Sequence, residues 1–430
     1  MCVVFYCTVD ATTKVAWVEN VRSYISSRIN FITMTALETP NWNGLPDDII
    51  ISVFSYLSLQ EKYHAALVCK AWYECFLMPP VWFRFRSYFY LPKQDTTLRI
   101  INRYAKYIKS LYIELDQATR NNRDNACQVL TTLSRTGGRK VSSLTIKFTG
   151  SNPLFFSGQE FMDALTSLFG PPLEGVQPPT KHLLEVDLSG LNVPYSDGIF
   201  RILGENNPEL QTLNIQNKIL VCKVTSAGLL EFVNCCTKLK DLRVYHCSMS
   251  DEILEALATE DREPIQHLGI ACRREEKYSR DLSSEAWCSV VRRSPRLRVT
   301  LWFDHTCPFM KIAMIMKRDI PIIELRLETS TRLEAEVFQA VLYYHSTLEK
   351  LVLFTIKSRG LNEALLYLAD KCKRIKSLYV NCILRQNVIE RILNKYPEMK
   401  EKKTFLLKSE SPEPEVYVVG QEVDEHILQL

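Results

Sequence analysis

The sequence lacks the short motifs of the common enzyme classes. It contains no H-E-x-x-H, no G-x-S-x-G and no Walker-type phosphate loop; Gly137-Gly138-Arg139-Lys140 lacks the loop length and the Ser or Thr that such a loop needs. The seven histidines are dispersed, and no C-x-x-C pair offers two thiolates at metal-ligand spacing. We therefore expect no catalytic residue, no metal site and no cofactor.

The chain also lacks a strong charge of either sign and a long apolar run. Its net charge of +4 is too small for a nucleic-acid-binding surface. No stretch approaches the ~20 apolar residues of a membrane span, and the apolar N-terminus has no basic leader of a secretory signal. The 14 cysteines are scattered and fit buried, reduced thiols better than a disulfide framework. We expect a cytoplasmic protein, with the nucleus as a second compartment, that binds neither nucleic acid nor membrane.

A helical pattern begins near residue 44. Pro46 suits a first helical position, where its missing N–H would have no partner. Apolar residues then recur at the spacing of one helix face, namely at Ile49, Ile50, Val53, Phe54 and Leu57. Ser58 and Glu61 have the spacing of a capping box, which starts a second helix. A third helix is expected over Lys70–Leu77, because a Pro-Pro pair follows shortly after it.

This segment resembles an F-box, a helical module that docks a protein onto a ubiquitin ligase. The resemblance rests on Leu45-Pro46, Leu67-Val68-Cys69-Lys70-Ala71-Trp72 and Val81-Trp82, which fall at F-box spacing. It implies binding to a Skp-family adaptor and, through the adaptor, to cullin and RING subunits. The residues that it assigns to the adaptor surface are Leu45, Pro46, Ile49, Ile50, Phe54, Leu57, Leu67, Val68 and Trp72.

The rest of the chain repeats the pattern apolar-x-x-apolar-x-apolar. It starts at Ile108-Leu111-Ile113, ends at Ile375-Leu378-Val380 and includes a distorted copy at Arg298-Leu301-Phe303. Most copies lie 24 to 33 residues apart, and helical patterns fill the intervals. Such a period is typical of leucine-rich repeats, whose units must stack to cover their apolar faces. A doubly wound sheet is the alternative, but no Gly-rich phosphate loop follows any of the strands.

The predicted fold is therefore an α/β chain with a three-helix F-box followed by a leucine-rich-repeat solenoid, a curved parallel sheet inside and helices outside. Cysteine or Asn-Pro at the helix ends is typical of the repeats that accompany F-boxes, so the chain resembles the F-box and leucine-rich-repeat family. The predicted domains are an N-terminal extension, the F-box, the solenoid and an acidic tail, at residues 1–43, 44–90, 91–408 and 409–430.

At the C-terminal end, Thr404-Phe405-Leu406-Leu407 lies about one repeat beyond Leu378, and we expect it to form the last edge strand. The tail beyond Lys408 has several carboxylates and no Lys or Arg, which predicts a solvated extension.

The resemblance implies a substrate-recognition subunit of an SCF-type (Skp–cullin–F-box) ubiquitin ligase, itself non-catalytic, whose repeats hold a protein substrate. A scaffold that binds the adaptor without directing degradation is the second hypothesis, and a repeat module without a ligase link is the third. Because side chains alternate across a strand, residues between the apolar positions should face the inner side of the sheet. Aromatic and arginine residues there are candidates for substrate binding; they are Arg243, Tyr245, Trp302, Arg326, Phe354 and Tyr379.

Overall fold

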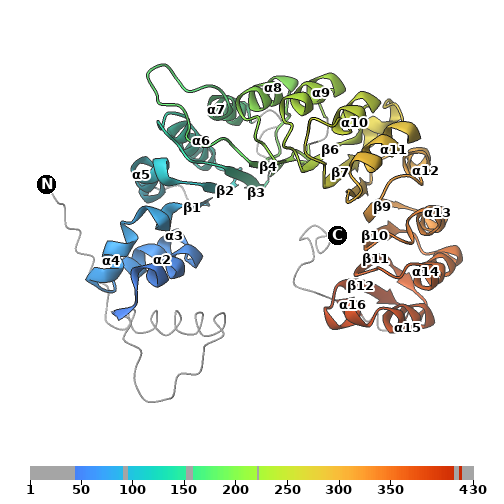
Figure 1. Cartoon of the computed structure of the whole chain (residues 1–430). Coiled ribbons are helices and arrows are strands. Elements are labelled where there is room, and N and C mark those ends of the chain that lie inside the picture. Colours follow the sequence, from blue (N-terminus) through green and yellow to red (C-terminus); the bar gives the residue numbers. More distant parts are fainter. Residues whose placement is uncertain (1–43, 91–94, 152–157, 220–221, 411–415, 419–430) are drawn as a thin grey trace, which may run out of the picture. The chain divides into compact units, whose positions relative to one another are not determined.

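The computed structural model describes most of the chain (Figure 1). The described residues are 44–90, 95–151, 158–219, 222–410 and 416–418. The chain divides into two compact units, Met1–Ile50 and Ile51–Leu430. The N-terminal extension and most of the acidic tail lie outside the described residues, so the domain limits expected there stay predictions.

Three short helices form the N-terminal part, as the sequence predicts: α2 (Asp47–Tyr56), α3 (Leu59–Ala66) and α4 (Lys70–Phe76). A 3-10 turn, η2 (Pro79–Trp82), follows. The predicted capping box is present: Ser58 Oγ accepts from the Glu61 N–H at 3.3 Å, and the Glu61 carboxylate accepts from the Ser58 N–H at 2.8 Å. Both amides would otherwise lack partners at the helix start.

Aromatic side chains hold these helices together within the second unit. The ring of Phe54 lies 5.8 Å from that of Trp72 and 6.1 Å from that of Phe76. Trp82 closes the cluster edge-on against Phe76 at 5.0 Å, and its indole N–H donates to the Phe76 carbonyl at 2.9 Å. The large buried rings and the satisfied indole N–H supply the core that three short helices need.

The strands form one sheet whose spatial order follows the chain order. They are β1 (Arg84–Phe89), β2 (Ser110–Asp116), β3 (Ser143–Thr149), β4 (Glu185–Gly190), β5 (Thr212–Asn214), β6 (Asp241–Tyr245), β7 (His267–Cys272), β8 (Arg298–Phe303), β9 (Ile322–Thr331), β10 (Lys350–Thr355), β11 (Ser377–Leu384), β12 (Phe405–Ser409) and β13 (Val416–Val418). Strands β1 to β12 pair in parallel, and β13 pairs with β12 antiparallel.

Helices alternate with these strands (Figure 1). They are α5 (Asp95–Tyr104), α6 (Arg120–Ser134), α7 (Gln159–Phe169), α8 (Asp197–Asn206), α9 (Ser226–Cys235), α10 (Asp251–Leu257), α11 (Ser284–Arg293), α12 (Phe309–Ile315), α13 (Glu334–Tyr344), α14 (Arg359–Lys371), α15 (Gln386–Lys395) and α16 (Pro397–Glu401). Short 3-10 turns also occur at η3 (Ala105–Tyr107), η4 (His246–Ser248) and η5 (Arg274–Lys277). Consecutive helices from α5 to α11 and from α12 to α16 contact each other, so they form a second layer.

The apolar positions of the repeat form the core between the two layers. The central leucines pair across neighbouring strands: Leu213 is in register with Leu242, and Leu242 with Leu268. All three are fully buried. Because each repeat covers the apolar face of its neighbour, the predicted solenoid of stacked strand–helix units is confirmed. The opposite face of the sheet, which we call the open face, carries the residues between the apolar positions.

The two ends of the sheet differ from the sequence prediction. The sheet starts at β1, one strand before the first predicted repeat, since Phe85 and Phe89 alternate with exposed residues. In the distorted repeat, Arg298 is exposed and Leu297 is buried in its place. At the other end β12 forms as expected, but it is not the edge strand, because β13 pairs with it. Part of the segment expected to be a solvated tail is thus a strand.

Candidate docking and binding surfaces

Exposed apolar side chains gather at the end of α3 and on α4. Leu67 is 47% and Val68 42% exposed, and Tyr63 and Tyr73 are also exposed. Tyr63 and Leu67 stand four residues apart, and therefore on one helix face. Large apolar side chains grouped on a surface are typical of a protein-binding site. The two tyrosines were not predicted, although their helical spacing to the predicted pair could have indicated them.

The predicted adaptor residues fall into three groups of exposure. Pro46, Ile49, Leu67 and Val68 are exposed, and Leu45 and Leu57 are half-buried. Ile50, Phe54 and Trp72 are at most 3% exposed. The sequence did not determine which of the nine residues face the core, and the structure places these three there. A role of the other six in adaptor binding stays a prediction.

Helix α3 also carries a buried lysine, Lys62. Lys62 is 5% exposed; its Nζ donates to the Val81 carbonyl at 3.1 Å and lies 5.4 Å from the centre of the Trp82 ring. Burial, and to a smaller extent repulsion from Arg86, lower the pKa of Lys62 to about 8. Loss of solvation of this charge therefore destabilises the folded state.

The open face carries a groove of about 900 Å³ that extends along the sheet from β2 to β10. Six lysine and arginine side chains and three carboxylates line it, together with Trp302. The charged residues are Lys147, Lys218, Arg243, Arg298, Arg326, Lys350, Asp187, Asp241 and Glu324. An excess of positive charge along a long groove favours an acidic or polar ligand over an apolar one.

Several of these charges are fixed by neighbours. The guanidinium of Arg243 donates to both oxygens of Asp241, at 3.0 and 2.9 Å. His267 joins Asp241 at 3.0 Å on one side and Thr300 at 3.0 Å on the other. Burial alone would raise the pKa of Asp241, but the hydrogen bonds with His267 and Arg243 outweigh it and hold the pKa below its usual value. The groove floor is thus an ordered polar surface.

Of the six predicted substrate residues, three line the groove and three are buried. Arg243, Trp302 and Arg326 line the groove. Tyr245, Phe354 and Tyr379 are 2%, 5% and 5% exposed, so the expectation of exposed aromatics is wrong for these three. Tyr245 ends β6, and its hydroxyl reaches the side-chain and backbone oxygens of Asn217 at 2.7 and 2.8 Å. Phe354 and Tyr379 belong to a buried apolar cluster.

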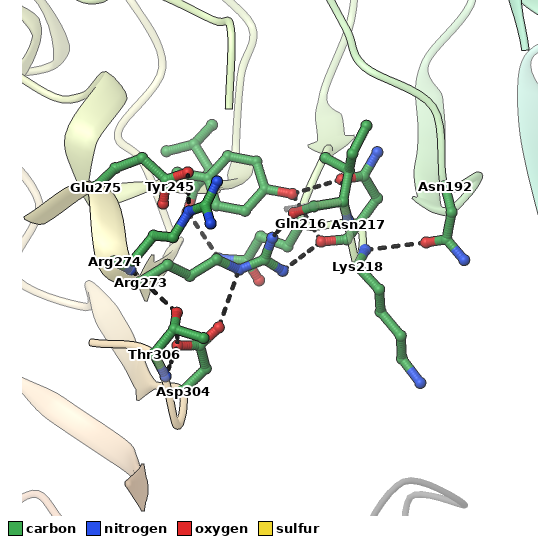
Figure 2. Close-up of polar contacts among 12 residues, drawn as sticks. Asn192, Gln216, Asn217, Lys218, Tyr245, Arg273, Arg274, Glu275, Asp304 and Thr306 are labelled. Atoms are coloured by element: carbon green, nitrogen blue, oxygen red, sulfur yellow. Dashed lines mark hydrogen bonds and ion pairs between the residues drawn. The ribbon is translucent and has the colours of Figure 1, made fainter. Parts of the chain in front are cut away.

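Sequence reasoning missed the residue that organises the rim of the groove. The guanidinium of Arg273 lies between two rings, 4.6 Å from the centre of Tyr245 and 5.9 Å from that of Trp302. It donates to the carbonyls of Ile219 and Asn217 and pairs with Asp304 (Figure 2). No motif marks an arginine in the turn after a strand, so only its partners in neighbouring repeats show its role.

Asn217 anchors the other side of this network. Its side chain is fully buried, and its Nδ2 donates to the carbonyls of Leu191 and Val193 at 2.9 and 2.8 Å. Neighbouring backbone is fixed as well, since Asn192 Oδ1 accepts from the Lys218 N–H at 2.9 Å (Figure 2). The hydrogen bonds of the Asn217 side chain to neighbouring repeats hold this part of the rim in one position.

Two cysteines from consecutive repeats meet close to the rim. The sulfur of Cys222 lies 3.3 Å from Ser248 Oγ. A hydrogen bond from Cys247, and a smaller one from Ser248, lower the pKa of Cys222 to about 7 against the opposing effect of burial. The same contact raises the pKa of Cys247. The twelve cysteines that the structure describes are all free thiols.

Two further findings concern the described residues only. In that part of the chain, no cluster of three or more His, Cys, Asp or Glu side chains could hold a metal ion. Likewise, none of the helices described there has the length and apolar character to cross a membrane.

Comparison with known proteins gives one family match and several relatives. The family model described as F-box-like matches residues 42–87, which include α2 to α4. Human F-box/LRR-repeat protein 8 is 27% identical over 374 residues, which is 86% of this chain and 96% of that protein. The bovine protein of the same name is 27% identical over 358 residues, 83% of this chain and 93% of that protein. Mouse F-box/LRR-repeat protein 21 is 26% identical over 276 residues, 61% of this chain and 60% of that protein.

The matches cover both parts of the architecture. The family model falls on the helices that carry the exposed apolar residues, and the relatives extend over the repeats. Together with the parallel sheet of stacked strand–helix units, they show that the chain is similar, over most of its length, to F-box/LRR-repeat proteins.

Proposed function

We propose that this protein is a substrate-recognition subunit of an SCF-type ubiquitin ligase. The observation that carries the proposal is the exposed apolar group of Leu67, Val68, Tyr63 and Tyr73 inside the segment that matches the F-box-like family. These side chains would be buried against a Skp-family adaptor, and the adaptor would join the protein to cullin and RING subunits.

The repeats would hold the substrate, a protein, in the groove of the open face. This chain would perform no bond-making step itself. It would raise the effective concentration of a substrate lysine near the ubiquitin-charged conjugating enzyme, which converts an encounter between two molecules into a reaction within one assembly. A rim held by the hydrogen bonds of Arg273 and Asn217 suits this positioning role.

Co-expression with the adaptor tests the docking step. Leu67→Asp combined with Val68→Asp should lower adaptor affinity at least about tenfold, because two apolar contacts are lost and two charges would be buried. Both side chains are exposed in the free chain, so melting should not change. Met310→Asp with Leu342→Asp is the control, since these apolar side chains on α12 and α13 are also exposed and lie outside the F-box-like segment. Adaptor binding at wild-type level in the first variant would refute the docking surface.

A ubiquitylation assay distinguishes a substrate-recognition subunit from a scaffold that only binds the adaptor. The reconstituted complex of full-length protein, adaptor, cullin and RING subunit should modify a co-purified partner, and the Leu67→Asp, Val68→Asp variant should not. If adaptor and cullin bind but no partner is ever modified, the protein is a scaffold that binds the adaptor without directing degradation.

A further inference from the structure

Two cysteine side chains from consecutive repeats meet beside the rim of the groove. Cys222 follows β5, and Cys247 lies in η4, directly after β6. The Cys247 thiol donates a hydrogen bond to the Cys222 sulfur, and Ser248 Oγ lies 3.3 Å from the same sulfur. Ser248 Oγ also donates to the Val224 carbonyl at 2.7 Å, which fixes its position. The Cys222 sulfur therefore has two hydrogen-bonding neighbours, and one of them is a second thiol.

The two thiols differ in protonation. Both residues keep part of their surface exposed. The hydrogen bond from Cys247 lowers the pKa of Cys222 to about 7, and the same bond raises the pKa of Cys247. At neutral pH about half of Cys222 is therefore thiolate, whereas Cys247 keeps its proton. An accessible cysteine of low pKa beside a second thiol is typical of a redox-sensing cysteine with its resolving partner.

A second pair of cysteines in the array lacks these features. Cys272 and Cys307 also come from consecutive repeats, but both are buried, and burial raises the pKa of each. Cys235 is partly exposed, yet burial of its thiol raises its pKa as well. These three cysteines should react slowly with oxidants, so they are internal references for Cys222.

We propose that Cys222 and Cys247 form a peroxide-reactive dithiol that closes to a reversible disulfide beside the rim of the groove. The Cys222 thiolate attacks one oxygen of hydrogen peroxide; the O–O bond breaks, hydroxide leaves, and the sulfur becomes a sulfenic acid. The Cys247 sulfur then attacks the Cys222 sulfur, so that the S–S bond forms and the S–O bond breaks. The departing hydroxide takes the proton of Cys247 and becomes water. A dithiol reductant reverses the oxidation by thiol–disulfide exchange.

The disulfide would join two segments that support the rim. Lys218, which lines the groove, lies four residues before Cys222. Tyr245, whose hydroxyl bonds to Asn217, lies two residues before Cys247. Oxidation would therefore tie the segment after β5 covalently to η4, next to the proposed substrate surface. The reaction depends on the two thiols alone, so it goes beyond the proposed ligase function and does not require it.

Peroxide treatment of the full-length protein at pH 7 tests the dithiol. Trypsin releases the two cysteines on separate peptides, residues 219–223 and 244–262, so a bond between them gives a linked pair in mass spectrometry without reduction. We expect this pair within one chain, and we expect dithiothreitol to remove it. Cys222 should be oxidised at least about fivefold faster than Cys235, because its larger thiolate fraction outweighs its lower nucleophilicity.

Cys247→Ser is the matched variant, because serine keeps a hydrogen-bond donor beside Cys222 but cannot form the disulfide. In this variant Cys222 should stop at sulfenic acid, which dimedone traps. Cys272 and Cys307 should stay reduced in both proteins. Oxidation of Cys222 no faster than that of Cys235, a bond to another cysteine, or a linkage between two chains on a non-reducing gel would each overturn the proposal. If the variant melts abnormally, the peptide map of the wild type decides alone.

Discussion

Arg273 and Tyr245 form one unit across neighbouring repeats: the guanidinium lies 4.6 Å from the ring centre, and both groups bond to Asn217 (Figure 2). A surface aromatic was expected at position 245, but the tyrosine is a structural link between the repeats of β5, β6 and β7. Its substitution therefore tests stability and is unsuited to a test of substrate binding.

Tyr245→Phe should destabilise the protein by about 1–2 kcal/mol, because the oxygens of Asn217 lose a hydroxyl donor while the ring stays in place. Denaturant unfolding measures the change. Tyr88→Phe, on a half-exposed tyrosine of β1, should stay within about 0.5 kcal/mol of the wild type. Equal effects of the two substitutions would mean that the hydroxyl of Tyr245 is not a stabilising donor.

Lys62→Met should stabilise the protein at pH 7 by about 1–2 kcal/mol. The lowered pKa of about 8 corresponds to a burial cost that the variant removes, less the lost hydrogen bond to Val81. Below pH 8 both folded and unfolded wild type hold the proton, and the cost is complete. Between pH 8 and 10.5 the folded state releases the proton first, so wild-type stability rises with pH.

The stability difference between Lys62→Met and wild type should therefore shrink as pH rises from 8 toward 10.5. Unfolding at several pH values checks this trend. Lys70→Met is the control, since that side chain is 90% exposed and its substitution should leave the pH dependence unchanged. A constant advantage of the Lys62 variant across this range would rule out the buried charge as its cause.

Cys222 should be alkylated at neutral pH. The thiolate is the reactive form, and the hydrogen bond from Cys247 lowers the pKa of Cys222 to about 7. Cys235 is an internal reference, because burial raises its pKa and its labelling should need higher pH. In Cys247→Ala the midpoint for Cys222 labelling, followed by mass spectrometry, should move upward. An unmoved midpoint would show that the neighbouring thiol does not stabilise the thiolate.

Trp302→Ala with Arg243→Ala should reduce capture of partner proteins without affecting adaptor binding. Both side chains line the groove and keep part of their surface exposed. Arg326 is less suitable, because its loss would strand the buried carboxylate of Glu328 at 2.8 Å. The catalogue of co-purifying proteins is the readout. Tyr278→Ala with Arg359→Ala, an exposed pair outside the groove, is the control. Unchanged capture in the groove variant would place recognition elsewhere.

The repeats were predictable because a buried position recurs in every unit. Leu213, Leu242 and Leu268 occupy one row, and hydrophobic burial leaves this spacing in the sequence. The cap of α3 was predictable because it is local: Ser58 and Glu61 satisfy backbone groups within a few residues of each other. Strand β1 was missed because its alternating phenylalanines lack the leucine template.

Exposure on the open face was harder to predict. Alternation correctly puts Val352 and Tyr379 opposite the helices, but it does not say what lies above them. Tyr245 depends on an asparagine 28 residues away and Arg273 on carbonyls more than 50 residues away. Such partners come together only when repeats stack, so no local sequence pattern predicts these contacts.

The antiparallel direction of β13 also affects where duplication could add further repeats to the array. A parallel solenoid lengthens when a strand–helix unit is duplicated, because each new strand pairs with the last in the same direction. Strand β13 runs antiparallel to β12. A copied unit added after β13 would therefore have to pair its strand with one that runs in the opposite direction. A unit inserted between β2 and β12 would keep the parallel order, so the antiparallel strand favours growth of the array from within.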